Sequence, residues 1–453
     1  MTDPTITGAL AAWVSDLTYE DIPVAVRERV KDLFLDALAS GLAGNSGDEI
    51  DQIDEVARGL GGDSDESTVL ARHASTPVGA ALMNGYLITA ATVCDVHRPT
   101  LCHVTPEVVP PALVVAEQRD ATGRDLIVAL AAGLETTTRI GVALDYPVFR
   151  RHGWHSPGVI GPFGGAAAAG RLLGLDAVAQ CNALGLAGSQ AAGTFAHWGT
   201  PTIKFHQSRG ALSGLLAATL AATGFQASPD ILAAQDGGLF TSYAEGGRPE
   251  AVVDRLGDHW ELMNISLRLW PVASSIQSMV TALFAALAER PLEAASIESI
   301  RIGLSETVYR MHGELGWDSR FRALLSARYV ASVVVHDQAC WLDQFTPERI
   351  ADPKVDAFAR DRIRVEVDPK LATNAAVVEV RTTDGQASVV QRDAPRGDSS
   401  DPLSRDEILD KFRRASAPLM TEGEADRVSA TATRLEEAPG TCSLIRAFRA
   451  DHP

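Results

Sequence analysis

Three segments of the sequence place a histidine or a lysine next to a predicted helix start. They are His103-Val-Thr-Pro106, His155-Ser-Pro-Gly158 and Lys204-Phe-His-Gln-Ser-Arg209. Ser and Thr are favoured N-cap residues and Pro is favoured at the first helical position, so we expect Thr105, Ser156 and Ser208 to cap three helices. Unbonded backbone N–H groups and the positive end of the helix dipole lie at such starts. If the three starts converge, they form a pocket for carboxylates or phosphates that needs no metal.

The residues that flank Lys204 in the sequence indicate that its side chain is buried. It lies between the uncharged segment Thr200-Pro-Thr-Ile203 and Phe205, where a solvated lysine is less expected. Burial would lower the pKa of its amine, which could then act as a general base or as an electrostatic clamp. The alternative is a lysine without a catalytic role. Arg209 could bind an anion through its guanidinium fork or lie at the surface.

The other candidates each have a structural alternative. His103 and His155 could transfer protons, or be packed or capping histidines. Asp95 lies in a loop before His103 and could orient a catalytic histidine, or only satisfy the loop. His97, in the same loop, has the same two interpretations. Tyr329 could donate to an oxyanion, or be a core tyrosine with one hydrogen bond.

Composition and charge exclude several classes of protein. The chain has 453 residues, is 46% hydrophobic, and carries 40 basic against 58 acidic residues, a formal net charge of −18. This composition is ordinary for a globular protein and wrong for a disordered one. The acidic excess argues against nucleic acid or an anionic membrane as a partner. A small anionic ligand would therefore need cations gathered locally in its pocket.

The cysteines indicate no metal or cluster site. They are Cys94, Cys102, Cys181, Cys340 and Cys442. Their sparse, odd number without a CxxC pair is typical of the reducing cytoplasm and gives no zinc or iron–sulfur spacing. The segment Met1–Ala12 lacks a basic region followed by an apolar run, so we expect no secretory signal. There is no P-loop or HExxH motif, and we expect neither a cofactor nor a metal.

The elements that carry these residues are predicted to be helices. Pro23, with Asp21 as cap, starts a helix with apolar residues at helical spacing, and three further segments share this periodicity. These segments are Asp125–Thr137, Asp176–Ala187 and Leu212–Ala222. Two long stretches without acidic residues, Lys or Arg, roughly 74–94 and 177–203, resemble buried, closely packed helices rather than membrane spans. We expect a large all-helical domain over residues 1–265.

The pattern changes to mixed helix and strand after this point. Strands are predicted at Ile297–Leu304, Arg362–Val367, Ala375–Arg381 and Gln386–Gln391, with Asp384-Gly385 as a turn before the last. Helices are predicted at Ser275–Ala288 and Leu325–Ala339. These elements indicate a smaller α+β domain over residues 266–395. After a polar linker, Ser404–Arg414 and Glu422–Leu435 are helical again, so residues 396–453 are expected to complete the first domain.

Several motifs occur in the order found in one family of enzymes. They are Asp95-Val-His-Arg-Pro99 with His103, Val108-Val-Pro-Pro-Ala-Leu113, Gly153-Trp-His-Ser-Pro-Gly158, Lys204-Phe-His206 with Gly214-Leu-Leu-Ala217, Tyr329-Val-Ala331 and Ala394-Pro-Arg-Gly397. Over nearly its whole length the chain resembles the MmgE/PrpD family, which includes 2-methylcitrate dehydratase, cis-aconitate decarboxylase and iminodisuccinate epimerase. The resemblance implies a helical first domain, an α+β lid domain, an active site between them, no metal, and usually a homodimer.

The resemblance also implies roles for individual residues. The catalytic candidates are Asp95, His103, His155, Lys204 and Tyr329. Besides these carried-over positions, we expect His206, Arg209, Arg268, Gln277 and Tyr146 to bind the substrate. Two segments depart from the family's pattern: Arg268-Leu-Trp-Pro271 replaces a common Lys-Pro-Tyr-Pro, with Gln277 at a place where a cationic or proton-transferring residue is common, and Val96-His97 replaces an Asp-Thr pair.

The expected activity is chemistry at the carbon next to a carboxylate of a small di- or tricarboxylate. The main expectation is a dehydratase-type lyase, in which Lys204 or His155 removes the α-proton and His103 holds a carboxylate. One alternative is an epimerase, with Tyr146 as a second acid/base opposite Lys204. Another is a cis-aconitate-type decarboxylase, which needs a proton donor but no initial base. A non-catalytic carboxylate-binding protein is the alternative from a different class.

Overall fold

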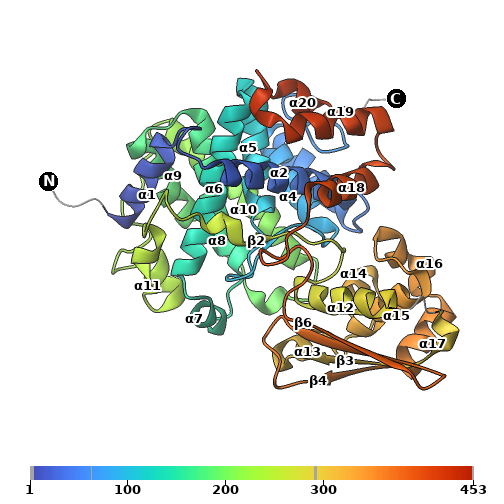
Figure 1. The fold of residues 1–453 in the computed structure, drawn as a ribbon. Coiled ribbons are helices and arrows are strands. Elements are labelled where there is room, and N and C mark those ends of the chain that lie inside the picture. Colours follow the sequence, from blue (N-terminus) through green and yellow to red (C-terminus); the bar gives the residue numbers. More distant parts are fainter. Residues whose placement is uncertain (1–4, 63, 290–292, 451–453) are drawn as a thin grey trace. The chain divides into compact units, whose positions relative to one another are not determined.

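The computed structural model describes residues 5–62, 64–289 and 293–450, and the chain forms two compact units (Figure 1). Unit 1 comprises the residues up to Ser266 and those from Ser404 onward, and unit 2 comprises Leu267–Leu403. The predicted fold class is confirmed: the protein is mainly helical, with 59% helix and a small mixed sheet in the C-terminal region. Each unit is described below by itself.

Unit 1 is built from helices joined by loops and one short strand pair. Its longer helices are α1 (Ile6–Asp16), α2 (Val24–Gly44), α3 (Ile50–Gly61), α4 (Pro77–Ala90), α5 (Thr105–Arg119), α6 (Gly123–Ala143), α8 (Ser156–Leu173), α9 (Ala177–Gly188), α10 (Thr202–Ala222), α18 (Arg405–Ser416) and α19 (Glu422–Thr433). The shorter elements include α7 (Tyr146–Arg151), α11 (Leu239–Ala244), α20 (Cys442–Arg446), and the strands β1 (Val96–His97) and β2 (Ile265–Ser266), which pair antiparallel.

The core of unit 1 lies where α8 packs against α5, α6 and α10. Small residues let these helices approach closely. A Cβ added at Gly214 of α10 would lie 2.7 Å from the Cα of Gly165 of α8, so the two backbones are almost in contact. This close crossing holds α8 and α10 against each other, and the N-terminal parts of these helices carry His155 and His206.

One described helix, α6, is long and apolar enough to cross a membrane by length and composition. However, 94% of its most apolar window is buried inside the fold, as in the core helix of a globular protein. Its interior carries Glu135 and Arg139, which are both buried and paired with each other.

Two expectations for helices are corrected by the structure. The second uncharged stretch, 177–203, is not one packed helical region: α9 ends at Gly188, and residues 189–201 form turns and a short 3-10 helix that are largely solvent-accessible. The helix after Asp21 begins at Val24, with Pro23 as its N-cap, because Asp21 instead accepts hydrogen bonds from the backbone and hydroxyl of Thr18.

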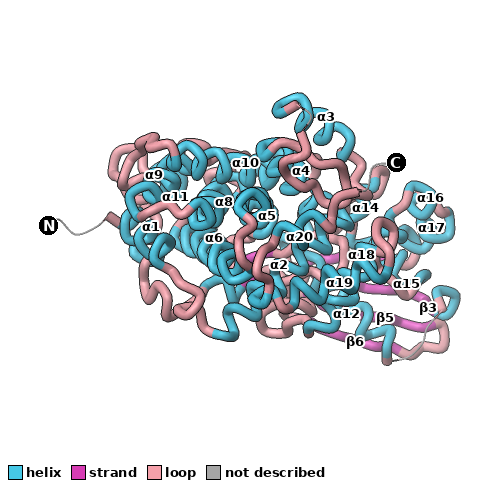
Figure 2. Tube along the Cα trace, turned by 90° about the horizontal axis from the view of Figure 1, so that it is seen from above, coloured by secondary structure: helices cyan, strands magenta, loops and turns pink. Residues whose placement is uncertain are grey.

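Unit 2 contains a four-stranded sheet in the order β4-β3-β5-β6. Its strands are β3 (Ile297–Leu304), β4 (Ile363–Val367), β5 (Ala376–Thr382) and β6 (Ala387–Arg392), and its helices are α12 (Gln277–Ala288), α13 (Glu306–His312), α14 (Arg320–Leu325), α15 (Ala327–Asp337), α16 (Pro347–Ile350) and α17 (Pro353–Asp361). Strand β3 is parallel to β4 and antiparallel to β5. The four predicted strands are confirmed to within one residue at each end. Figure 2 shows the sheet strands beside α12, which packs on β5 and β6.

Candidate functional site

Two buried imidazoles meet where α8 and α10 begin. His155 is the N-cap residue of α8, and His206 lies in the second turn of α10. Their Nδ1 atoms are 3.0 Å apart. One Nδ1–H must therefore donate to the other ring's Nδ1 lone pair, which requires at least one neutral ring. When both rings are neutral, the Nε2 of one is a lone-pair base and the Nε2 of the other is an N–H donor.

Both rings of this pair have depressed pKa values. Burial is the main cause for His155, and the charges of His206, His103 and Arg150 add to it, so its pKa lies well below the usual range. Burial, followed by the charges of Arg209 and His197, lowers the pKa of His206 to about 4. The pair is therefore uncharged at neutral pH.

His103 is held by the loop that precedes α5. Its Nδ1–H donates to the backbone carbonyl of Asp95 at 2.6 Å, which leaves the lone pair on Nε2 when the ring is neutral. The Asp95 carboxylate accepts from the backbone N–H groups of Val104 and Thr105, at 2.8 and 3.0 Å, and from the Thr105 hydroxyl. Asp95, and not Thr105 as expected, therefore caps α5. Burial raises the pKa of Asp95, against the effect of these hydrogen bonds.

The loop before α5 is also tied to the start of α8. Ser156 is the first residue of α8 rather than its cap, and its hydroxyl donates to the backbone carbonyl of Thr100 at 2.8 Å. The backbone N–H of His155 donates to the carbonyl of Gly193 at 3.0 Å. Two of the three predicted helix starts are thus joined directly, and they bring His103 close enough to His155 to lower its pKa.

Lys204 lies elsewhere on α10 than the sequence predicts. The helix begins at Thr202, so Lys204 and Ser208 are inside it, and the Ser208 hydroxyl donates to the carbonyl of Leu82 instead of capping a helix. Lys204 is buried, with its Nζ 3.6 Å from a carboxylate oxygen of Glu49. His206, two residues on, leaves α10 on a different side, toward α8. Lys204 thus belongs to a second polar group, distinct from the histidine pair.

Glu49 is shared by two donors in this second group. The hydroxyl of Tyr86, on α4, donates to the same carboxylate oxygen at 3.0 Å. Burial and the Glu49 charge raise the pKa of Tyr86 far above its ordinary value. The Glu49 carboxylate thus binds both the Lys204 amine and the Tyr86 hydroxyl. Neither Glu49 nor Tyr86 was expected from the sequence.

Arg209 acts on the histidine pair, and the predicted candidate Tyr146 lies near Arg150. The Arg209 guanidinium donates to the backbone carbonyls of Gln190, Gly158 and Ala192, at 2.6–2.8 Å, and so fixes the loop after α9 to α8. Tyr146 begins α7, and burial raises its pKa to about 12 although the charge of Arg150 opposes this.

Arg150 is a neighbour of the site that sequence reasoning missed. Its guanidinium carbon lies 3.5 Å from the centre of the Phe195 ring, and that ring meets His155 edge-on with centroids 6.0 Å apart. His197 is a second missed neighbour, with its ring 5.7 Å from that of His206. The basic run Phe149-Arg150-Arg151-His152, directly upstream of the His155 motif, was the available signal for Arg150.

The remaining candidates lie in unit 2. The Tyr329 hydroxyl donates to the backbone carbonyl of Gln344 at 2.6 Å, and burial raises its pKa far above the ordinary value. Arg268 and Gln277 are both buried and both donate to the backbone carbonyl of Val272, at 3.3 and 3.0 Å. The Gln277 side-chain oxygen has no hydrogen-bond partner among the residues that the structure describes.

Comparison with known proteins identifies the family. The MmgE/PrpD N-terminal domain matches residues 8–251, and the MmgE/PrpD C-terminal domain matches residues 270–437. The chain belongs to the MmgE/PrpD family. The resemblance seen in the sequence is thereby confirmed.

Relatives of this MmgE/PrpD protein align over almost their full length. A cis-aconitate decarboxylase-like protein from Aspergillus oryzae is 28% identical, with 97% of this chain and 96% of the relative covered. A cis-aconitate decarboxylase from Aspergillus terreus is 27% identical, over 93% and 91%. A cis-aconitate decarboxylase from Mus musculus is 24% identical, over 98% and 93%. The chain is thus similar from end to end to lyases that act on a tricarboxylate.

The MmgE/PrpD protein shows no cluster of metal-binding side chains within residues 5–62, 64–289 and 293–450. In that part of the chain, no three His, Cys, Asp or Glu side chains gather as ligands of a metal would.

Proposed function

We propose that this MmgE/PrpD protein is a cofactor-independent lyase that decarboxylates a small unsaturated tricarboxylate of the cis-aconitate type. The observation that carries the proposal is the neutral His155–His206 pair, with His103 and Arg150 close by. The names of the relatives support the same reaction. A dehydratase, the main expectation from the sequence, and an epimerase are the other candidates.

The pair is suited to bind an anion and to take up a proton with it. A bound carboxylate stabilises the imidazolium form, so it raises the pKa of the rings that burial has lowered. Binding of a trianion therefore draws a proton onto the pair from solvent. The Arg150 guanidinium adds attraction for the carboxylates. The histidine pair is uncharged in the resting site. In the bound site it carries the extra proton that the reaction transfers to the substrate.

The reaction then needs one bond broken and one formed. The bond between carbon and the departing carboxylate breaks and releases CO2, and the electron pair left behind is delocalised into the conjugated unsaturated carboxylate. The proton on a histidine Nε2 passes to the carbon that receives this electron pair. Donors placed on the remaining carboxylates stabilise the developing charge, each worth about 3–4 kcal/mol. The imidazole returns to its neutral form.

The position of Lys204 argues against this amine as the base of a dehydration or an epimerisation. Both reactions start by removing an α-proton, and Lys204 could do so only as a neutral amine, which leaves a neutral imidazole as the base for those reactions. The Lys204 ammonium is paired with Glu49 at 3.6 Å, and this attraction stabilises the charged amine. A charged lysine can bind a carboxylate or donate a proton, but it cannot accept one.

An NMR screen of di- and tricarboxylates in D2O tests the proposed function. With cis-aconitate we expect loss of CO2 and one deuterium in the product. Loss of water from a hydroxy acid such as 2-methylcitrate, or exchange of an α-hydrogen without CO2 release, would assign the dehydratase or the epimerase instead. Binding without any conversion would make the protein a carboxylate-binding protein.

Two variants test the residues, with one matched control. His155→Gln and Lys204→Ala should each lower kcat by about 10²-fold or more, because general acid–base groups contribute at least this much. His152→Gln is the control: it is three residues upstream, its side chain is 43% exposed, and it bonds Glu245 outside the pair. Turnover near the wild-type value in His155→Gln would refute the role of the pair.

A further inference from the structure

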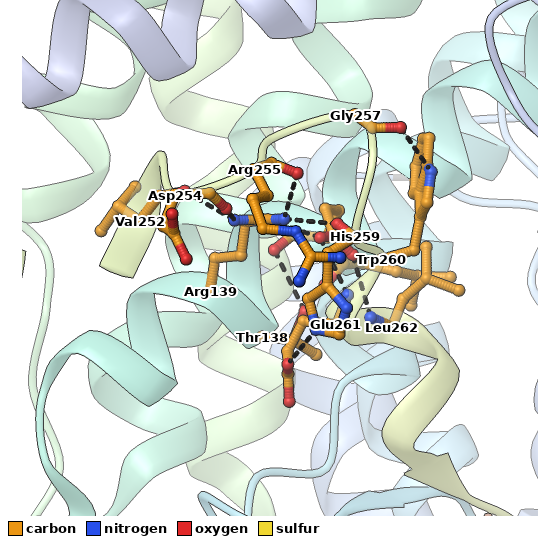
Figure 3. Close-up of polar contacts among 12 residues, drawn as sticks. Thr138, Arg139, Val252, Asp254, Arg255, Gly257, His259, Trp260, Glu261 and Leu262 are labelled. Atoms are coloured by element: carbon orange, nitrogen blue, oxygen red, sulfur yellow. Dashed lines mark hydrogen bonds and ion pairs between the residues drawn. The ribbon is translucent and has the colours of Figure 1, made fainter. Parts of the chain in front are cut away.

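A single carboxylate, that of Glu261, connects the loop carrying His103 to a different part of unit 1. Glu261 opens the 3-10 helix η3 (Glu261–Asn264). One of its oxygens lies 3.0 Å from His97 Nε2 and accepts from the Asn264 amide at 3.0 Å, and the other lies 3.3 Å from His259 Nε2. Figure 3 shows Glu261 beside His259 in this network.

The backbone that carries Glu261 is fixed by a buried ion pair on α6. The Glu135 carboxylate accepts from the backbone N–H groups of Glu261 and Leu262, both at 2.9 Å. Arg139, paired with Glu135, donates to the backbone carbonyls of Asp254, at 2.8 Å, and of His259 (Figure 3). Glu135 and Arg139 are both buried, and each bonds the other as well as backbone groups of the segment 252–262. These bonds hold that segment against α6.

His97, the partner of Glu261, stabilises the loop 95–103 that carries His103. It is fully buried, and its Nδ1 lies 2.8 Å from the Thr100 hydroxyl. Its backbone N–H donates to the carbonyl of Cys102 at 2.7 Å, and it pairs with Ile265 in the β1–β2 ladder. The same Thr100 provides the carbonyl that receives the Ser156 hydroxyl at the start of α8.

These contacts form one continuous series of hydrogen bonds between His103 and the start of α8, where His155 lies. Asp95 and His103 flank the loop 96–102, and His97 holds the shape of that loop through Thr100 and Cys102. Burial alone would raise the pKa of Glu261, but hydrogen bonds from His97 and Asn264 lower it to about 2. Glu261 therefore stays ionised and keeps its attraction for His97 over the whole working range of pH.

We propose that His97 and Glu261 are positioning residues, which hold the loop 95–103 so that His103 faces His155. This proposal rests on the proposed function of the histidine cluster. Neither residue bonds a reacting group in the structure, and their action passes through the Asp95 carbonyl, the Thr100 carbonyl and Ser156. A displacement of about 1 Å at a reacting group can cost about 10²-fold in rate, so such a tether is expected to affect kcat.

The kinetic test compares three variants at the tethering carboxylate. Glu261→Ala removes the acceptor and should lower kcat about tenfold or more while KM changes less than about threefold. Glu261→Gln keeps an oxygen for the His97 Nε2–H and should retain most of the activity. His259→Gln is the matched control, because His259 contacts the same carboxylate but is 49% exposed and does not touch the loop 95–103. A kcat equally reduced in Glu261→Gln and Glu261→Ala would contradict the proposal.

A double-mutant cycle and NMR complete the test. His97→Asn should cost as much as Glu261→Ala, and the double variant little more, because both break the same contact. Additive losses would refute the tether. Histidine Cε1–H resonances, observed without substrate, should show altered titration of His103 and His155 in Glu261→Ala and no change in His259→Gln. This readout tests the positioning even if cis-aconitate is not the substrate, and unchanged titration in the folded Glu261→Ala variant would overturn it.

Discussion

Two buried imidazoles that face each other through their Nδ1 atoms cannot easily both be charged. Protonation of both rings would place an N–H donor against another N–H donor. His155 and His206 are in this position. Their neutral resting state is the property on which the proposed chemistry depends, since the bound anion must supply the attraction that charges them. The pH at which each ring takes up a proton therefore decides the charge of the site.

The titration of His206 gives a direct answer. In the ligand-free protein we expect its Cε1–H resonance to titrate near pH 4, because burial and the charges of Arg209 and His197 oppose protonation. Addition of citrate, a stable tricarboxylate, should move the titration upward by one pH unit or more. His206→Gln identifies the resonance by its loss. A free-protein titration above pH 6 would contradict the neutral pair.

The sequence could predict the types of the central residues but not all their partners. His103, His155 and His206 follow from motifs beside helix starts. Arg150 and Glu261 do not, because each reaches the site through space: Arg150 over the ring of Phe195, and Glu261 across 164 residues to His97. Such contacts depend on the packing of helices, which local pattern does not encode.

At the scale of elements, the expected helices were found, but several of their expected caps were wrong. The segment Asp176–Ala187 is helical as its periodicity predicts, and Asp176 caps α9, whereas Asp21 and Ser156 do not cap their helices. The start of α5 was assigned to the wrong cap because the capping carboxylate comes from Asp95, which precedes the helix by ten residues. For α10, Ser208 has capping chemistry but lies inside the helix, where its hydroxyl bonds the carbonyl of Leu82. Propensity identifies residues able to cap, and tertiary structure decides which ones do.

The close crossing of α8 and α10 makes a prediction at this scale. Gly214→Ala would place a methyl group 2.7 Å from the Cα of Gly165 and 2.8 Å from the backbone nitrogen of Ala166, so the helices must separate. We expect a loss of about 1–3 kcal/mol in unfolding free energy. Because the same helices carry His155 and His206, kcat should fall as well. Chemical denaturation and steady-state kinetics measure the two effects.

Gly59 on α3 provides the matched control for this substitution. A Cβ added there meets nothing within 4 Å, and the residue is exposed within a helix. Gly59→Ala should therefore stabilise the protein by about 0.5–1 kcal/mol, through helix propensity alone, and leave kcat unchanged. Equal effects of the two substitutions would show that the α8–α10 contact is not tight.

At the scale of the whole molecule, each unit contains buried histidines that resist protonation. In unit 1 these are His155 and His206. In unit 2 it is His312, whose Nδ1–H donates to the backbone carbonyl of Leu325 at 2.7 Å and whose Nε2 lies 2.6 Å from the Ser275 hydroxyl. Burial lowers the pKa of His312 to about 4, as it does for His206. The two units are thus sensitive to acid in the same window of pH.

The consequence is a loss of stability between about pH 6.5 and pH 4. In this window the unfolded chain binds protons at His155, His206 and His312 and the folded protein does not, so unfolding free energy falls as the pH falls. Each histidine should contribute on the order of 1–3 kcal/mol. The depressed pKa of Glu261, about 2, adds a further loss only below about pH 4.5, where that group protonates in the unfolded chain first.

Urea denaturation at pH 7.0, 5.5 and 4.5 measures this dependence, with His312→Gln as the variant that separates the units. The variant loses the two hydrogen bonds of His312 and should be less stable than the wild type at pH 7.0. Its stability should then fall less steeply between pH 7.0 and 4.5, because one of the titrating histidines is gone. The contributions of His155 and His206 stay in this variant, and His206→Gln removes that of His206 separately. Wild-type stability that is constant over this range would contradict the neutral, buried state of these rings, and with it the uncharged resting site that the proposed decarboxylation requires.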